Sequence, residues 1–197
     1  MRADARLPPE FFARDVRALA RDLLGRVLRT VTPEGTAAGV IVETEAYRRD
    51  ESCCHTFRGR TARNASMFGP PGTAYVYFIY GMHHCVNLVG EAEGSGCAVL
   101  LRALVPTEGL DLMRHRRGPK VTDARLCAGP GSLCRALAID RTWDGLDVTA
   151  SDRVAVLAGE ALPESEVITS PRVGVVGRPE DVALPWRFRQ RGVPHLR

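Results

Sequence analysis

The chain has 197 residues, of which 45% are hydrophobic and 25% are charged. This composition is typical of a folded globular protein and excludes a disordered one. The length suits one domain with a sizeable core, so we assign residues 1–197 to a single domain. No apolar run approaches the roughly 20 residues that span a bilayer. The N-terminus lacks the apolar stretch of a secretory signal, so we expect a cytoplasmic location and no membrane partner.

The net charge of +4 is mildly basic and is carried almost entirely by arginine, since Lys120 is the single lysine. Arginine binds phosphates bidentately and never supplies a neutral amine. The charge balance is therefore compatible with a nucleic-acid partner without establishing one.

The first predicted element is an amphipathic helix over Pro8–Leu24, in which Phe12, Val16, Leu19 and Leu23 recur at helical spacing. A hairpin of two strands follows, at 26–31 and 37–47. Alternation along its second strand places four side chains on one face: Ile41, Glu43, Glu45 and Tyr47.

Residues 50–72 are polar and arginine-rich, and they predict a long ordered loop, which in a compact domain is more often functional than idle. Strands are then expected at 74–80 and 83–89, joined by a turn at Gly81, and at 97–105.

In the second half, Thr107 is expected to cap a short helix, and a second helix is predicted over Gly129–Ile139. Further strands are predicted at 153–159 and 172–177, before a tail that contains LPWRFRQRG. Antiparallel strand pairs with helices added at intervals indicate a mixed α/β fold of the α+β type, with a mainly antiparallel sheet.

Two carboxylates, Glu43 and Glu45, project from the strand that leads to Tyr47. They fit either a solvated strand face or a general base that activates water. Spacing alone does not choose between the two acids.

Tyr75 and Tyr77 alternate, as core aromatics often do, whereas Tyr80 breaks the alternation at a hairpin turn. An aromatic side chain at such a tip, close to arginines, is typical of a wedge or stacking platform for nucleic acid. Two polar residues, Arg102 and Asn87, lie inside apolar strands, and each is expected to have a specific partner.

Three of the six cysteines are close in sequence to histidines, since His55 follows Cys53 and Cys54 while His83 and His84 precede Cys85, which admits a mixed Cys/His zinc site. However, the chain has no C-x-x-C pair, and the spacing matches no common zinc pattern. Buried free thiols are the better interpretation, and we expect no metal and no cofactor.

Several long motifs, in order and covering nearly the whole chain, closely resemble the alkyladenine (3-methyladenine) DNA glycosylase family. They are VETEAY, CCHTFRGRTARN, MFGPPGTAYVYFIYGMHHCVN, VLLRALVPTEGLDLM and GPGSLCRALAI. The resemblance implies a single α/β domain with a curved antiparallel sheet flanked by helices. It also implies a metal-free base-excision-repair enzyme that removes alkylated and deaminated purines from double-stranded DNA.

The resemblance assigns catalytic roles to two residues. Glu45 matches the general base that deprotonates the attacking water, and Arg102 matches an arginine that helps to hold that water. For the flipped base, Tyr47 and His55 match the residues that sandwich it and Tyr77 completes the pocket. Asn87 matches the residue that crowds the exocyclic amine of guanine.

For DNA contacts, Tyr80 matches the side chain inserted where the base has left, and Met82 flanks it. Three loop arginines and a helix start are further candidates for backbone contacts, although a solvated loop and a plain helix cap explain them nearly as well. These residues are Arg58, Arg60, Arg63, Gly131 and Ser132.

Glycosylases that also cut the backbone use an amine to form a Schiff base. Because Lys120 lies outside every site motif, we expect a monofunctional enzyme that leaves an abasic site. Since one polypeptide binds one lesion, we also expect a monomer. Two alternatives remain: a non-catalytic nucleic-acid-binding module and a Cys/His metalloprotein. For a bacterial source, the expected location is the cytoplasm with nucleoid association.

Overall fold

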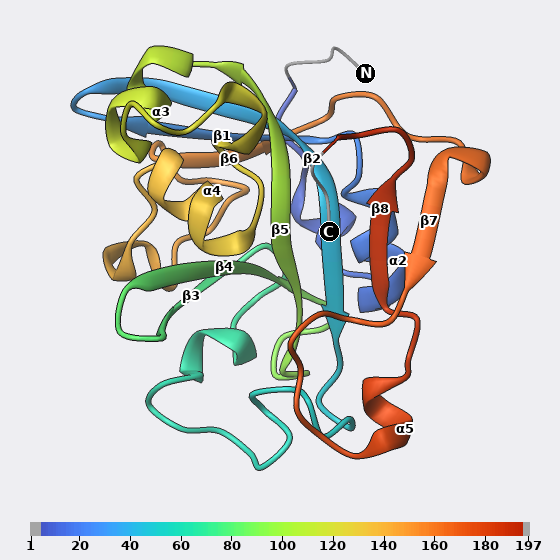
Figure 1. Cartoon of the computed structure of the whole chain (residues 1–197). Coiled ribbons are helices and arrows are strands. Elements are labelled where there is room, and N and C mark those ends of the chain that lie inside the picture. The colour runs from blue at the N-terminus through green and yellow to red at the C-terminus, as the bar shows by residue number, and fades with distance from the viewer. Residues whose placement is uncertain (1–4, 195–197) are drawn as a thin grey trace.

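An open sheet of eight strands organises residues 5–194, the part of the chain that the computed structural model describes (Figure 1). The strands are β1 (Val27–Thr32), β2 (Gly35–Tyr47), β3 (Ala74–Ile79), β4 (His83–Gly90), β5 (Cys97–Glu108), β6 (Val154–Leu157), β7 (Val167–Ser170) and β8 (Arg187–Gln190). Their order is β3-β4-β5-β2-β1-β6, and β8 pairs with both β2 and β7. Every pairing among these described strands is antiparallel, which confirms the predicted α/β class with its antiparallel sheet.

Short helices connect and cover the strands. They are α1 (Pro9–Phe12), α2 (Val16–Asp22), α3 (Leu110–Arg117), α4 (Pro130–Ala136) and α5 (Pro179–Val182), with single 3₁₀ turns at Ala65–Phe68, Asp123–Arg125, Arg141–Trp143 and Glu164–Glu166. Within residues 5–194, none of these helices has the length and apolar character that crossing a bilayer requires.

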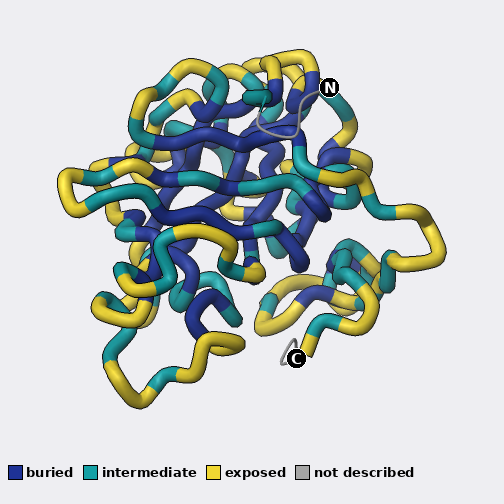
Figure 2. The backbone as a smooth tube through the Cα atoms, turned by 90° about the horizontal axis from the view of Figure 1, so that it is seen from above, coloured by how far each residue is buried: buried dark blue, intermediate teal, exposed yellow. Residues whose placement is uncertain are grey.

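The sheet separates two apolar clusters, because side chains alternate between its faces. The larger cluster includes Val76, Val86 and Leu101 together with buried side chains of α2 and α4. The smaller cluster, on the other face, includes Tyr75, Tyr77 and other buried side chains from the same strands and the 50–72 loop. Figure 2 shows that buried backbone is concentrated in the central strands, whereas the surrounding loops are largely exposed.

The single N-terminal helix that periodicity predicts is in fact two helices, α1 and α2. All four apolar side chains of the pattern are buried, so the predicted face is right. The break occurs because the Asp15 side chain accepts hydrogen bonds from the backbone N–H groups of Arg17 and Ala18, and this cap starts a new helix. Gly25, with φ +80°, lies just beyond α2.

Two β-bulges change which side chains of β2 and β5 face the same way. Ile41 pairs with Leu104 and Glu43 with Ala103, so Val42 is an extra residue in β2. Thr44 then pairs with Leu101, so Arg102 is an extra residue in β5. Ile41 therefore faces the larger cluster, and the prediction that it shares a face with Glu43 was wrong. Such bulges redirect side chains and are common beside active sites.

Other differences have local causes. Thr107 lies within β5 instead of capping α3, which begins after Gly109 in the left-handed region (φ 72°). Residues 172–177 form no strand, because polar groups of this segment bind side chains instead: Arg172 donates to Glu51, and the backbone N–H of Val173 donates to Glu45. Sequence reasoning also missed β7, which pairs with the tail strand β8 along 167–170.

Replacing Asp15 with alanine tests the cap that divides the two N-terminal helices. The free energy of unfolding should fall by about 1 kcal/mol, because the first N–H groups of α2 lose their acceptor. Urea denaturation measures the change. Asp15→Asn is the matched control, since asparagine caps helices equally well and should keep most of the stability. An equal loss in both variants would contradict the capping role.

Candidate active site

A cavity of about 550 Å³ lies on the smaller-cluster side of the sheet. Its walls come from β2, β3, β4 and β5, from the 50–72 loop and from residues 173–176. Six of the residues singled out from the sequence line it: Tyr47, His55, Tyr77, Tyr80, Asn87 and Arg102. Their convergence from five separate segments supports the predicted pocket for a flat aromatic ligand.

Glu45 is fully buried beside this cavity, and its carboxylate accepts three hydrogen bonds. The Tyr47 hydroxyl donates to Oε2 over 2.8 Å, and Arg102 Nη1 donates to the same oxygen over 3.2 Å. The backbone N–H of Val173 donates to Oε1 over 2.8 Å. Two of these donors, Tyr47 and Arg102, line the cavity, so Oε2 lies immediately behind its wall.

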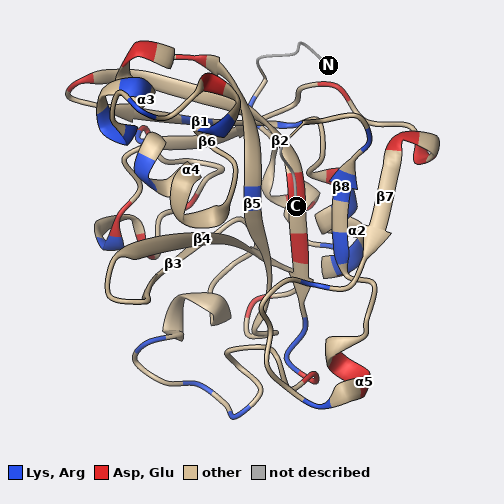
Figure 3. Cartoon of the chain, in the orientation of Figure 1, with Lys and Arg blue, Asp and Glu red and all other residues tan. Residues whose placement is uncertain are grey.

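The structure separates the roles of the two acids of β2. Glu43 Oε1 accepts from Arg102 Nε (2.9 Å) and from Arg187 Nε (2.6 Å), so it is held by two guanidinium groups. Figure 3 shows acidic positions on β2 beside basic positions on β5 and β8. Of the two carboxylates, Glu45 is therefore the one bonded to a cavity-lining hydroxyl, which favours it as the reactive acid.

The Tyr47 side chain contacts Glu45 through its hydroxyl and Arg172 through its ring. Burial raises the pKa of its hydroxyl well above the ordinary value, and the charge of Glu45 adds to this effect, so the group remains a donor. The guanidinium carbon of Arg172 lies 4.7 Å from the centroid of the Tyr47 ring. This cation–π contact fixes the ring orientation from behind.

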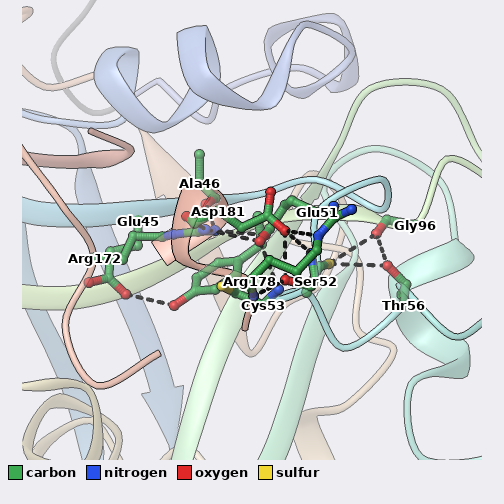
Figure 4. Close-up of polar contacts among 12 residues, drawn as sticks. Glu45, Ala46, Glu51, Ser52, Cys53, Thr56, Gly96, Arg172, Arg178 and Asp181 are labelled. Carbon is green, nitrogen blue, oxygen red and sulfur yellow. Dashed lines mark hydrogen bonds and ion pairs between the residues drawn. The ribbon is translucent and has the colours of Figure 1, made fainter. Parts of the chain in front are cut away.

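Arg172 joins the C-terminal segment to the cavity (Figure 4). Its guanidinium makes two hydrogen bonds to Glu51, of 2.6 and 2.9 Å, and also donates to the carbonyls of Ala46 and Asp181. Nearby, the Ser52 hydroxyl donates to Asp181 over 2.6 Å. Sequence reasoning missed this clamp, because Arg172 lay in a predicted strand. Its only signal was a lone arginine before an apolar run.

The aromatic wall consists of His55, Tyr75 and Tyr77. The His55 and Tyr77 ring centroids are 4.7 Å apart and nearly perpendicular, and Tyr75 stacks on Tyr77 at 5.4 Å. His55 Nδ1 also forms a 3.0 Å hydrogen bond with the Tyr75 hydroxyl. Partial burial and, next, the charge of Arg63 lower the pKa of His55, which favours a neutral imidazole.

Asn87 lies on β4 opposite Tyr75 and is 95% buried, with 5% of its surface exposed. Its side-chain Nδ2 donates to the Tyr75 carbonyl over 3.2 Å, which satisfies the expectation of a specific partner. The same hydrogen bond fixes the amide in the cavity wall. The other buried polar residue, Arg102, has the two carboxylates as partners.

The β3–β4 hairpin carries the exposed aromatic predicted at its tip. Tyr80 is 78% exposed and Met82 is 70% exposed. Tyr80 adopts φ 53°, a conformation that is uncommon for a residue with a side chain and that marks a constrained turn. Tyr80 lines the cavity, whereas Met82 does not.

Gly131 and Ser132 lie at the start of α4, next to the β3–β4 hairpin. A Cβ atom at Gly131 would lie 2.9 Å from the His83 ring, so glycine permits the hairpin to approach the helix. The Ser132 hydroxyl accepts a 3.0 Å hydrogen bond from Arg117. Both residues therefore have structural roles in this state.

The loop arginines Arg58, Arg60 and Arg63 are exposed and line none of the cavity. Arg63 lies over the Tyr77 ring, at 5.9 Å from its centroid, and Arg60 lies over Phe68 at 5.8 Å. Lys120 is also exposed, in the turn after α3, and does not line the cavity.

The cysteines are free thiols: Cys53, Cys54, Cys85, Cys97, Cys127 and Cys134. Burial raises the pKa of Cys54 to about 11 and of Cys127 to about 12, so these thiols remain protonated at neutral pH. Within residues 5–194, no three His, Cys, Asp or Glu side chains gather closely enough to hold a metal ion.

Burial raises the pKa of three of the four tyrosines: Tyr47, Tyr77 and, to about 12, Tyr75. Above the ordinary value of 10.0, the unfolded chain loses these protons while the folded chain keeps them. The free energy of unfolding should therefore fall as the pH rises through this window. In a titration with base, tyrosinate absorbance should appear at a higher pH in the folded protein than in urea. Ionisation of all four tyrosines near pH 10 without unfolding would contradict the burial.

A comparison with known proteins finds similar sequences over most of the chain. The family model described as methylpurine-DNA glycosylase (MPG) matches residues 10–194. A protein of Rubrobacter xylanophilus is 49% identical over 85% of this chain and 84% of its own. One from Rhodopseudomonas palustris is 49% identical over 95% of this chain and 88% of its own, and one from Methanocella arvoryzae is 44% identical over 95% and 94%. All three are named "Putative 3-methyladenine DNA glycosylase".

Proposed function

Because this chain belongs to the methylpurine-DNA glycosylase family, we propose that it removes damaged purines from duplex DNA through Glu45. It is a DNA glycosylase of base excision repair, a hydrolase that cleaves the bond between base and sugar. The observation that carries the assignment of the site is the buried Glu45 carboxylate, bonded to Tyr47 and Arg102 in the wall of an aromatic cavity.

Extrusion of the nucleotide comes first, since the bond to be cut cannot be reached inside a stacked duplex. Unstacking costs about a few kcal/mol and is easier for a weakly paired lesion. Tyr80 enters the gap that the base leaves and offsets part of this cost. Its exposure and its place between the hairpin tip and the cavity support this role.

The extruded purine stacks against Tyr47, His55 and Tyr77 in the cavity. A cationic base such as 3-methyladenine gains about 0.5–2 kcal/mol from electron-rich rings. Two features of the site suit such a base. The Tyr47 hydroxyl donates a hydrogen bond to the Glu45 carboxylate, which increases the electron density of the Tyr47 ring. The lowered pKa of His55 favours a neutral imidazole, which does not repel a cationic base.

Hydrolysis then follows at the sugar. Glu45 takes a proton from a water molecule, the water oxygen bonds to the anomeric carbon, and the purine leaves with the electrons of the broken bond. Arg102, which donates to Glu45 Oε2, orients the water on the same side. A cationic purine leaves as a neutral molecule, so activation of water suffices for it.

Selection against normal guanine is assigned to Asn87. Its amide is fixed by the Tyr75 carbonyl, and a rigid side chain in the wall can crowd the exocyclic amine of guanine. We assign backbone contacts to the exposed loop arginines and to Gly131 and Ser132 of α4, none of which lines the cavity.

The product is an abasic site, without strand cleavage, because the single lysine lies outside the cavity. One chain holding one lesion acts as a monomer. Its substrate places it on chromosomal DNA in the cytoplasm, the nucleoid of a bacterial cell.

Replacing Glu45 with glutamine should abolish most excision. Loss of the general base lowers the single-turnover rate constant for a 3-methyladenine duplex by about 10²- to 10⁴-fold, while affinity for the duplex is retained. Glu108→Gln removes an exposed carboxylate of the same sheet and should leave the rate unchanged. If the wild type releases no base and Glu45→Gln changes nothing, the chain is a non-catalytic nucleic-acid-binding module.

Replacing Tyr80 with alanine should impair extrusion. The single-turnover rate on a lesion in duplex DNA should fall by about 10-fold or more, since stacking of an aromatic side chain is worth about 1–3 kcal/mol. The same lesion in single-stranded DNA should be affected much less, because no gap must be filled. Phe78→Ala, on the same hairpin and 48% exposed, is the control. Equal losses on single- and double-stranded substrates would exclude a wedge.

A further inference from the structure

Glu43 lies beside the site and has no part in the hydrolysis described above. It is 3% exposed, and a single oxygen, Oε1, accepts from Arg102 Nε of β5 and from Arg187 Nε of β8. A carboxylate in so dry a place is retained only when it is well paired. The question is therefore what this pairing achieves for the site.

The Arg102 guanidinium connects the two acids of β2. It uses Nε for Glu43 at 2.9 Å and Nη1 for Glu45 at 3.2 Å. Since a guanidinium is planar and rigid, fixing the direction of Nε also fixes the direction of Nη1. The bulge at Arg102 allows this, because the extra residue of β5 is released from strict pairing with β2.

Arg187 supplies the charge that makes the arrangement neutral. The side chains of Glu43 and Glu45 are matched by those of Arg102 and Arg187, and all four are at most 13% exposed. Arg187 comes from β8, whose three residues 187–189 pair with 43–45 of β2. Glu43 is therefore paired with a guanidinium group on each side of β2.

We propose that Glu43 is a positioning residue: it holds Arg102 in the orientation that serves Glu45, with Arg187 as its counter-charge. This inference rests on the proposed function, in which Arg102 and Glu45 act on the attacking water. Glu43 does not line the cavity, so its effect on excision passes through Arg102.

Removing the Glu43 carboxylate should change two measurable properties, the excision rate and the pH dependence of that rate. In Glu43→Gln, Arg102 loses its anionic Nε partner, and the single-turnover rate should fall by about 10- to 100-fold, as is typical when a supporting group is removed. One negative charge near Glu45 is also removed, so the acid limb of the pH–rate profile should move to lower pH. Affinity for the lesion duplex should not change.

The charged and titratable groups near Glu45 include Tyr77 on β3 and Cys85 on β4. On β2 the groups are Glu43 and the hydroxyl of Tyr47; on β5, Arg102. The segment after β7 contributes the backbone N–H of Val173, and β8 contributes Arg187 through Glu43. Of these, the experiment changes only Glu43 and Arg187.

The decisive control is the double variant Glu43→Gln/Arg187→Met. It removes the buried pair as a neutral unit, and such replacements are often neutral or stabilising, so thermal stability should recover relative to Glu43→Gln alone. The excision rate should stay low, because Arg102 still lacks its partner. The acid limb should return toward that of the wild type, since the removed charges cancel. Should Glu43→Gln fail to fold, the double variant decides alone.

Wild-type excision by Glu43→Gln, or recovery of rate together with stability in the double variant, would overturn the proposal and leave Glu43 a purely structural ion pair. Failure of the proposed function looks different. In that case wild type and Glu45→Gln release the same amount of 3-methyladenine, and no comparison with Glu43 variants arises. The two outcomes are therefore distinguishable in one set of assays.

Discussion

The burial of paired charge inside a sheet is the constraint on which this molecule depends. Glu43 and Glu45 project from one strand into a region with almost no water, which is tolerable only because Arg102 and Arg187 reach them from the strands on either side. A long β2 that pairs with β5 along one edge and with β8 along the other satisfies that requirement. Glu45 is thus positioned by a strand that is paired on both edges and not by a loop.

The two faces of the sheet divide the work. One face packs against α2 and α4 in the large apolar cluster and provides stability. The other carries Tyr75 and Tyr77, which line the cavity. Since side chains alternate along a strand, alternate residues of β3 and β4 build the two surfaces. The site therefore rests on a backbone that the core keeps rigid, which suits stacking and water activation.

The C-terminal segment contacts two residues of the site that project from β2. Arg172 lies behind Tyr47 and is bonded to Glu51, while the next N–H, of Val173, donates to Glu45. Two consecutive residues, Arg172 and Val173, thus hold both Tyr47 and Glu45 in place. The two acids therefore differ in their hydrogen-bond donors. Glu43 accepts from two guanidinium groups, whereas Glu45 accepts from a hydroxyl, a guanidinium group and a backbone amide.

The sequence by itself determined the class of fold, the hairpins, the buried face of the N-terminal helices and the exposed aromatic at Tyr80, because these follow from local periodicity and turn chemistry. It also indicated that Arg102 and Asn87 need partners. Only the tertiary structure decided what those partners are, which acid is bonded to the cavity-lining Tyr47, and that Arg172 packs on the Tyr47 ring. Bulges at Val42 and Arg102 shift the alternation, and ion pairs join residues more than a hundred positions apart. No local pattern encodes such contacts, since they exist only once the chain is folded.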